Sequence, residues 1–301
     1  MRDSISRAGD GASGGYGLGV AALVLAAALW SLNGPLIKLL NAGGDGVPPE
    51  TIACLRSLFG GLVMLPAARR GWVVLAAAPP FWPILSVTML TALTFTFVKA
   101  STMTAAANAI ILQYTAPLWV FLLSPWLLSE RPRARDGLVL LLTMAGVFVI
   151  LAGNPPGELN ALLVATSSGV FFALLQIVLR KLRHVPPATV VAMNFVGSGL
   201  LLLPLALGAG LPGTSWQWLL LAAMGVVQFS LPYLIFSWAL RYVEAHRAAL
   251  LVLLEAVLNP AWTWLAVGEP VPGPTLMGGP LIVLGVAMWV ILCARNDKKP
   301  D

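Results

Sequence analysis

The segment TIACLRSLFGGLVMLP, Thr51 to Pro66, is an apolar stretch with a single charge, and a related stretch recurs later in the chain. The later copy is TVVAMNFVGSGLLLLP, Thr189 to Pro204, which aligns without gaps and keeps Gly199 opposite Gly61. Both copies have the composition of a membrane-spanning helix, which needs about 20 mostly apolar residues. The two copies therefore indicate a membrane protein built from a repeated unit.

A second pair of related segments lies at nearly the same offset. Lys99 to Pro132 aligns with Trp238 to Val271, and this alignment pairs Glu130 with Glu269. Each repeat holds five apolar runs, an odd number, so the second repeat must enter the membrane from the opposite side. The sequence thus predicts an inverted-topology repeat, the arrangement in which two halves of a secondary transporter surround one central site.

The whole chain has a membrane protein's composition. Of its 301 residues, 58% are hydrophobic and only 10% are charged, whereas about a quarter are charged in a soluble domain. We predict an all-α integral membrane fold with ten transmembrane helices around a central cavity, as two five-helix repeats over 16–153 and 158–294, with tails at 1–15 and 295–301. The predicted spans are Tyr16 to Leu40, Pro48 to Ala68, Pro80 to Lys99, Thr104 to Leu128, Gly137 to Gly153, Leu159 to Leu179, Pro186 to Leu207, Trp216 to Leu240, Ala245 to Val267 and Thr275 to Ala294.

Basic residues mark one side of the predicted bundle. With ten spans, every Lys and Arg except Lys38, Arg56 and Lys99 falls in loops or tails on the same side. Cytoplasmic loops carry the excess of basic residues, so both termini are predicted to be cytoplasmic. These charges are scattered between apolar runs, which argues against a nucleic-acid partner. Residues 1–15 lack the apolar core of a secretory signal and are predicted to form a short mobile tail.

Four motifs carry a resemblance to the EamA-like branch of the drug/metabolite transporter superfamily, over about Gly17 to Ala294. The resemblance implies a carrier with a cavity between its halves, often an exporter of amino acids or related metabolites in the bacterial inner membrane. Proton antiport by alternating access is also implied. The last motif has Ala256 where the family commonly has Pro, which leaves Pro260 to bend that helix. The motifs are WSLNGPLIK from Trp30, LRSLFGG from Leu55, YTAPLWVFLLSPWLLSE from Tyr114 and LLEAVLNPAWTWLAVGE from Leu253.

Glu255 is the candidate for proton coupling and for cargo binding. Its helix is predicted to start near Ala245, so a rise of 1.5 Å per residue places Glu255 roughly 15 Å deep. A lone carboxylate there costs about 3 kcal/mol, so it should face a partner, water or the bundle interior. Burial favours the neutral acid, which suits a proton carrier, although a structural Glu is the alternative. Asn259 and Trp262 share its helix face and are further cargo-binding candidates, unless Asn259 caps the backbone freed by Pro260.

Trp30 and Asn33 precede Pro35, which removes a backbone hydrogen bond and predicts a helix break. Backbone groups at such breaks contact substrates in transporters, so Trp30 and Asn33 are cargo-binding candidates; a gating kink without cargo contact is the alternative. Gln176 and Gln228 lie mid-span and are candidates too. Hydrogen bonding between helices is the alternative for them, and is the default for the other polar residues inside spans, Gln113 and Tyr114 included.

Two basic residues lie inside predicted spans. Arg56 is too deep to reach the headgroups and needs a helix carbonyl, Glu255 or a cargo carboxylate as acceptor. Lys38 can extend to the headgroups, where Asp45 or Glu50 could pair with it.

A zwitterionic cargo would place its ammonium at Glu255 and its carboxylate at Arg56. Alternatively, these two charges neutralise each other, and the cavity takes nucleobases, sugars or drugs. An enzyme is disfavoured, because His184 and His246 both lie in or beside loops and no nucleophile or metal motif appears, so no cofactor or metal is predicted. The inverted repeat likewise disfavours a channel or passive scaffold. Close helix contacts within one chain or in a homodimer are permitted by Gly137, Gly146, Gly278, Gly279 and Gly285.

Overall fold

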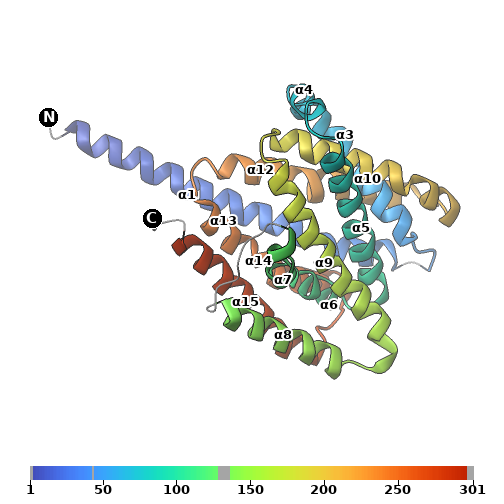
Figure 1. The fold of residues 1–301 in the computed structure, drawn as a ribbon. Coiled ribbons are helices and arrows are strands. Elements are labelled where there is room, and N and C mark those ends of the chain that lie inside the picture. Colours follow the sequence, from blue (N-terminus) through green and yellow to red (C-terminus); the bar gives the residue numbers. More distant parts are fainter. Residues whose placement is uncertain (1–2, 43, 128–135, 297–301) are drawn as a thin grey trace.

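The computed structural model describes residues 3–42, 44–127 and 136–296, and within them the chain is helical without strands (Figure 1). Glu130 and the basic residues at 131, 133 and 135 lie outside the described residues. The elements are α1 Asp3–Ser31, α2 Asn33–Leu40, α3 Pro49–Ala68, α4 Trp72–Ala76, α5 Phe81–Met103, α6 Ala106–Gln113, α7 Ala116–Leu127, α8 Asp136–Gly153, the 3-10 turn η1 Pro156–Glu158, α9 Leu159–Lys181, α10 Pro187–Ala209, α11 Ser215–Ala223, the π-helix η2 Met224–Ser230, α12 Leu231–Ala239, α13 Ala245–Val252, α14 Leu254–Val267 and α15 Gly273–Asn296.

Eight helical segments of the described residues are long and apolar enough to cross a membrane. Each coincides with one of the apolar runs expected from the sequence. The other two runs contain shorter apolar helical stretches, Leu140–Gly153 in α8 and Gly273–Met288 in α15. An all-helical arrangement follows from the solvent, because lipid offers no hydrogen-bond partners and a helix satisfies its own backbone groups.

Residues 3–15, which the sequence predicts as a tail before the first span, continue α1 (Figure 1). A helix already formed over the apolar run can be extended at little cost, because each added residue contributes one hydrogen bond without a new nucleation step.

Prolines explain two helix interruptions. α1 ends at Ser31 and α2 begins at Asn33, so the expected break ahead of Pro35 is present. There the Leu32 amide donates to the Leu29 carbonyl over three residues. The π-helix η2 lies just before Pro232, whose missing N–H cannot continue the regular ladder. Both interruptions bring side chains into the middle of the bundle.

The span Arg247–Val267 breaks at Leu253 and not at Pro260, which lies inside α14. A contact from a distant part of the chain lies at this break. The Tyr114 hydroxyl lies 3.2 Å from the Val252 carbonyl oxygen, while the Ala256 amide, which would donate to that oxygen in a regular helix, donates to Leu253 instead. The helix break therefore lies at Leu253, and α14 continues as a helix through Pro260.

Helices at corresponding positions of the two predicted repeats pack together. α3 packs along α10, and α8 packs along α15 (Figure 1). Gly146 and Gly278 make the second contact close, since a Cβ on either residue would meet the other's carbonyl oxygen. These two glycines therefore serve a contact within the chain.

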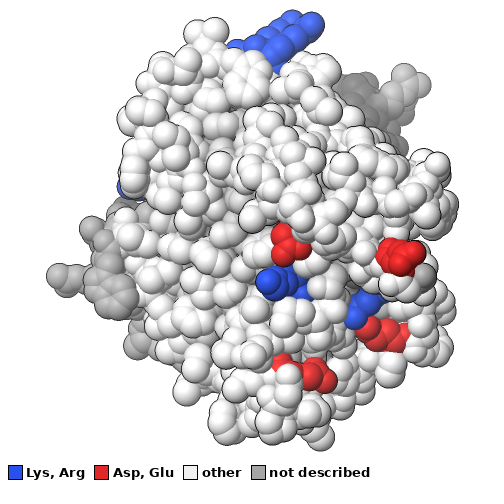
Figure 2. Space-filling model, turned by 90° about the vertical axis from the view of Figure 1, so that its right-hand side faces the viewer, with Lys and Arg blue, Asp and Glu red and all other residues white. Residues whose placement is uncertain are grey.

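The surface of the bundle is largely apolar. On the face of the molecule shown in Figure 2, a small mixed group of acidic and basic side chains lies on one half and is surrounded by uncharged residues. Large apolar side chains such as Phe148 and Met277 are 71% and 73% exposed. Apolar exposure on this scale suits contact with lipid.

Candidate functional site

A cavity of about 480 Å³ lies between the helices, within the range of about 300–1,000 Å³ typical of small-molecule sites. Its walls come from both halves of the chain. Six of the eight residues proposed from the sequence line it: Trp30, Asn33, Arg56, Gln176, Gln228 and Glu255.

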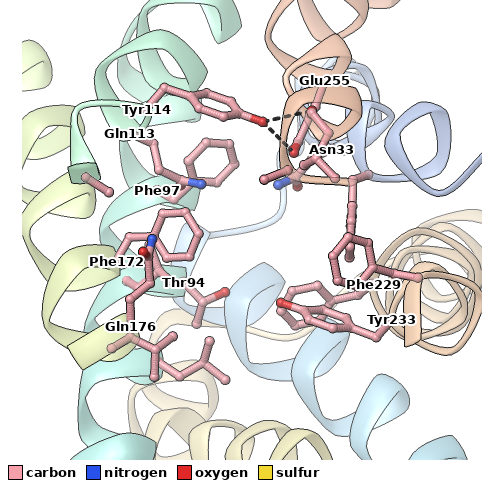
Figure 3. Close-up of a pocket in the computed structure, with 18 of the residues that line it drawn as sticks. Asn33, Thr94, Phe97, Gln113, Tyr114, Phe172, Gln176, Phe229, Tyr233 and Glu255 are labelled. Atoms are coloured by element: carbon pink, nitrogen blue, oxygen red, sulfur yellow. Dashed lines mark hydrogen bonds between the residues drawn. The ribbon is translucent and has the colours of Figure 1, made fainter. Parts of the chain in front are cut away.

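Glu255 is the one carboxylate among the described residues that line the cavity. It lies in the first turn of α14, because the helix restarts at Leu254 after the break. Free backbone N–H groups and the helix dipole stabilise negative charge at such a position. The Tyr114 hydroxyl lies 3.1 Å from Oε2 of Glu255, and Figure 3 shows it pointing toward the Glu255 side chain. Glu255 thus lines the cavity at a helix start, and its partner Tyr114 comes from the short break between α6 and α7.

Arg56 is held by Asn33 and Thr94, neither of which the sequence predicted as its partner. Its guanidinium donates from Nη1 to Oδ1 of Asn33 at 2.8 Å and from Nη2 to the hydroxyl of Thr94. Its Cζ lies 4.8 Å from the ring centroid of Phe229, a cation–π distance. Arg56 is only 2% exposed, so it is fixed in the wall.

The expected partners of Arg56, a helix carbonyl or Glu255, are therefore wrong. Arg56 and Glu255 both lie in the described part of the chain and form no ion pair. The physical reason is the break before α2: it turns Asn33 toward α3, where its carbonyl oxygen reaches the guanidinium first. The alternative in which these two charges neutralise each other is not favoured by this geometry.

The π-helix η2 places two side chains in the cavity wall. Gln228 is 2% exposed and donates from Nε2 to the Trp30 carbonyl at 3.1 Å, so it ties η2 to the end of α1. Phe229 stacks on Phe195 with ring centroids 4.0 Å apart. Trp30 contacts Tyr233 edge-on at 5.1 Å. This side of the cavity is consequently a rigid aromatic wall, which suits an apolar cargo body.

Asn259 and Trp262 do not line the cavity, so the expected lining stripe below Glu255 is wrong. Asn259 is fully buried where α14 crosses α2, and a Cβ on Gly34 would clash with its Oδ1. Neither polar atom of its side chain has a hydrogen-bond partner among the described residues, so the alternative role as a backbone cap is not observed either. Asn259 and Trp262 share a helix face with Glu255, but this does not place them in the cavity. The close crossing of α2 and α14 at Gly34 ends the cavity one turn after Glu255.

Two residues of the site were missed in the sequence. No feature of the sequence around Thr94 indicated a role in the site. Tyr114 was assigned to helix contacts by default, yet it stands three residues before Pro117, where α6 ends and α7 begins after a short break. Residues beside proline-interrupted helices are the best sequence indicators of a transporter site, and this rule would have selected Tyr114.

One end of the bundle is closed by a polar network that links both halves of the chain. Lys38 lies 2.6 Å from Oε2 of Glu269 and donates to the Thr104 carbonyl at 2.8 Å. Oε1 of Glu269 accepts from the Ala106 amide at 2.8 Å, which caps α6. We call Lys38, Thr104, Ala106 and Glu269 the closing network. The expected pairing of Lys38 with Asp45 or Glu50 is wrong, because the α2 helix turns Lys38 inward toward the junction of α5 and α6.

The cavity extends toward the other end of the bundle. None of the closing network lines it. Its walls instead include Leu179, Phe236 and Ala249, which lie close to the helix ends that carry Lys181, Arg241 and Arg247.

The fold and the cavity define a multi-pass helical membrane protein. The chain belongs to the EamA-like transporter family, which matches residues 17–152 and again residues 155–291. This match bears out the resemblance to the drug/metabolite transporter superfamily.

Several curated relatives carry transporter names. An uncharacterized transporter of Archaeoglobus fulgidus is 30% identical and covers 89% of this chain and 94% of its own. The pseudopaline exporter CntI of Pseudomonas aeruginosa is 27% identical, and the match covers 88% of this chain and 93% of CntI. The aromatic amino acid exporter YddG of Ancylobacter novellus is 23% identical, and the match covers 89% of this chain and 95% of YddG. A crystal structure that is 24% identical, with a TM-score of 0.61 and coverage of 93% and 98%, shares the fold.

Proposed function

We propose that this protein is a secondary active exporter of amino acids or related compounds that works by alternating access in a bacterial inner membrane. The observation that carries the proposal is a cavity lined by both halves, holding one carboxylate, and closed at one end by ion-paired side chains. The names of two relatives, a pseudopaline exporter and an aromatic amino acid exporter, support an amino-acid-like cargo.

The proposed arrangement is ten spans in two inverted repeats, with both termini in the cytoplasm. The family matches the chain twice, over ranges close to the two repeats. The corresponding segments α3 and α10 pack together, as do α8 and α15, which a pseudo-two-fold axis would bring about. The distribution of basic residues supports cytoplasmic termini.

In this arrangement the structure corresponds to a cytoplasm-open state. The cavity extends toward the helix ends with the basic residues, and the closing network seals the opposite end. Rocking of one half against the other would separate Lys38 and Glu269, which belong to different halves, and open the cavity outward.

Counterflow tests the function. Purified protein in liposomes preloaded with an unlabelled amino acid is expected to accumulate the same labelled amino acid transiently, because a carrier exchanges cargo across a single alternating site. Phenylalanine, tryptophan, leucine and methionine form the starting panel. Liposomes without protein are the control. Uptake that never exceeds equilibration for any member of the panel contradicts the proposal, and a channel gives that result.

Weakening the closing network is expected to open the outer end. The double substitution Lys38→Met with Glu269→Gln removes charge-assisted hydrogen bonds, each worth about 1.5–3 kcal/mol, so the outward-open population should rise about tenfold or more. The readout is the rate at which a membrane-impermeant thiol reagent, added outside, labels a cysteine introduced into the cavity by Phe172→Cys.

The matched control for this experiment is Asp45→Asn, which changes an acid outside the closing network. It should leave the labelling rate unchanged. Equal labelling from outside with and without the closing network would show that the network does not close the outer end. Faster labelling of the parent from outside than from the cytoplasm would reverse the proposed orientation.

A further inference from the structure

Most polar side chains of the cavity are already engaged within the protein. Arg56 is bonded to Asn33 and Thr94, and Gln228 is bonded to the Trp30 carbonyl. Such groups are poor receptors for cargo, since a new partner must first displace an existing hydrogen bond. The groups that remain free decide which cargo is held.

Arg56 Nε and Gln228 Oε1 are buried without a partner among the described residues, but Gln113 and Gln176 are the two cavity amides that are not engaged at either polar atom. Their side-chain amides line the cavity and form no hydrogen bond with any described residue. Gln113 ends α6 directly before the break, and Gln176 lies in α9. Figure 3 shows both on the side of the cavity opposite Glu255, beside the rings of Phe97 and Phe172.

The aromatic surroundings strengthen the argument. Phe97 and Phe172 offer no hydrogen-bond acceptor or donor to the neighbouring amides. An amide without a hydrogen-bond partner in the protein can bond to a cargo group without first losing an internal hydrogen bond, and the neighbouring rings cannot compete for it. Two amides on adjacent helices can present two N–H donors to one anionic group.

We propose that Gln113 and Gln176 bind the carboxylate of a zwitterionic cargo whose ammonium group is held by Glu255. The cargo then crosses the cavity from the carboxylate of Glu255 to the amide pair, with its apolar body against the aromatic wall. Arg56, the charged residue that would be the obvious carboxylate receptor, holds the wall together instead. This inference rests on the proposed export function and names the residues that select an amino acid over a simple amine.

The test compares two probes that differ by one carboxylate, L-phenylalanine and phenethylamine. Each is measured as a competitor of counterflow in liposomes. The double substitution Gln113→Met with Gln176→Met keeps the length of both side chains and removes their hydrogen bonds. The apparent affinity for phenylalanine is expected to fall about tenfold or more, while that for phenethylamine stays within about twofold.

Two further variants separate recognition from structure. Gln228→Met removes an amide of the same cavity that is hydrogen-bonded to the backbone. It should therefore change the apparent affinities for both probes by the same factor. Gln176→Glu retains the size and polarity of the side chain but repels a carboxylate. It should therefore lower the apparent affinity for phenylalanine and not that for phenethylamine, and this comparison remains possible if the double variant is unstable.

The inference is overturned if phenylalanine keeps its advantage over phenethylamine in the glutamine variants and loses it in Arg56→Lys. In that case Arg56 is the carboxylate receptor, and the proposed function still stands. Absence of counterflow with every amino acid of the panel in the unmodified protein is a different result, because it removes the proposed function itself.

Discussion

Replacing Glu255 by Gln is expected to lower amino-acid exchange by about tenfold or more. Glutamine keeps the size of the side chain and the contact with Tyr114, but it removes the negative charge that would hold a cargo ammonium. A charge-assisted hydrogen bond contributes about 1.5–3 kcal/mol, and every 1.4 kcal/mol is a factor of ten. The same substitution should remove the response of exchange to an imposed pH gradient. Counterflow measured with and without that gradient tests both expectations.

The control for this experiment is Glu244→Gln. Glu244 lies 3.3 Å from Arg247 at the surface, where ion pairs contribute little, so its removal should leave exchange unchanged. Tyr114→Phe should give an intermediate loss, because it frees Glu255 from its only hydrogen-bond partner among the described residues while keeping the charge. Wild-type exchange in Glu255→Gln with the same pH dependence would exclude Glu255 from the mechanism.

Replacing Gly225 by Ala is expected to destabilise the protein by about 1–3 kcal/mol, the usual cost of overpacking. Gly225 lies in η2 against α3. A Cβ there would come within 2.6 Å of the Arg56 carbonyl oxygen and 2.8 Å of the Gly60 amide nitrogen. These are backbone atoms, which cannot rotate away as a side chain can. The substitution should lower the unfolding temperature in detergent and displace the helix that carries Arg56.

Gly208→Ala is the matched control for that measurement. Gly208 also lies in a helix, α10, but a Cβ on it would meet nothing within 4 Å. Since Ala is favoured over Gly by roughly 0.5–1 kcal/mol in a helix, this variant should unfold at the same temperature as the parent or slightly higher. If both variants unfold alike, the close packing of η2 on α3 does not contribute to stability.

In the proposed mechanism, alternating access and cargo selection depend on different parts of the molecule. The closing network joins Lys38 to Glu269 at one end, whereas the proposed cargo contacts, Glu255 and the two glutamines, lie in the cavity. Variants of the network should therefore change the rate of opening more than the preference among cargos. Variants of the cavity should do the reverse.

Local features of the sequence were enough to predict the helices and some of their interruptions. Apolar runs about 20 residues long predict helices because lipid leaves the backbone no other partners. Pro35 predicts the break after Ser31 because it lacks an N–H and clashes with the preceding turn. The depth of Glu255 follows from its distance along one span, and it does line the cavity. Each of these predictions depends only on neighbours within about one helix.

Tertiary structure alone decided which partner each polar side chain meets. Lys38 meets Glu269, more than two hundred residues away in the chain, and Tyr114 meets the Val252 carbonyl, where α13 ends and the helical span breaks. Periodicity shows which residues share a helix face, but not which helix that face meets or how closely. Packing between helices sets which faces meet and how closely. Gly34, for example, lets α2 approach Asn259 so closely that Asn259 is excluded from the cavity.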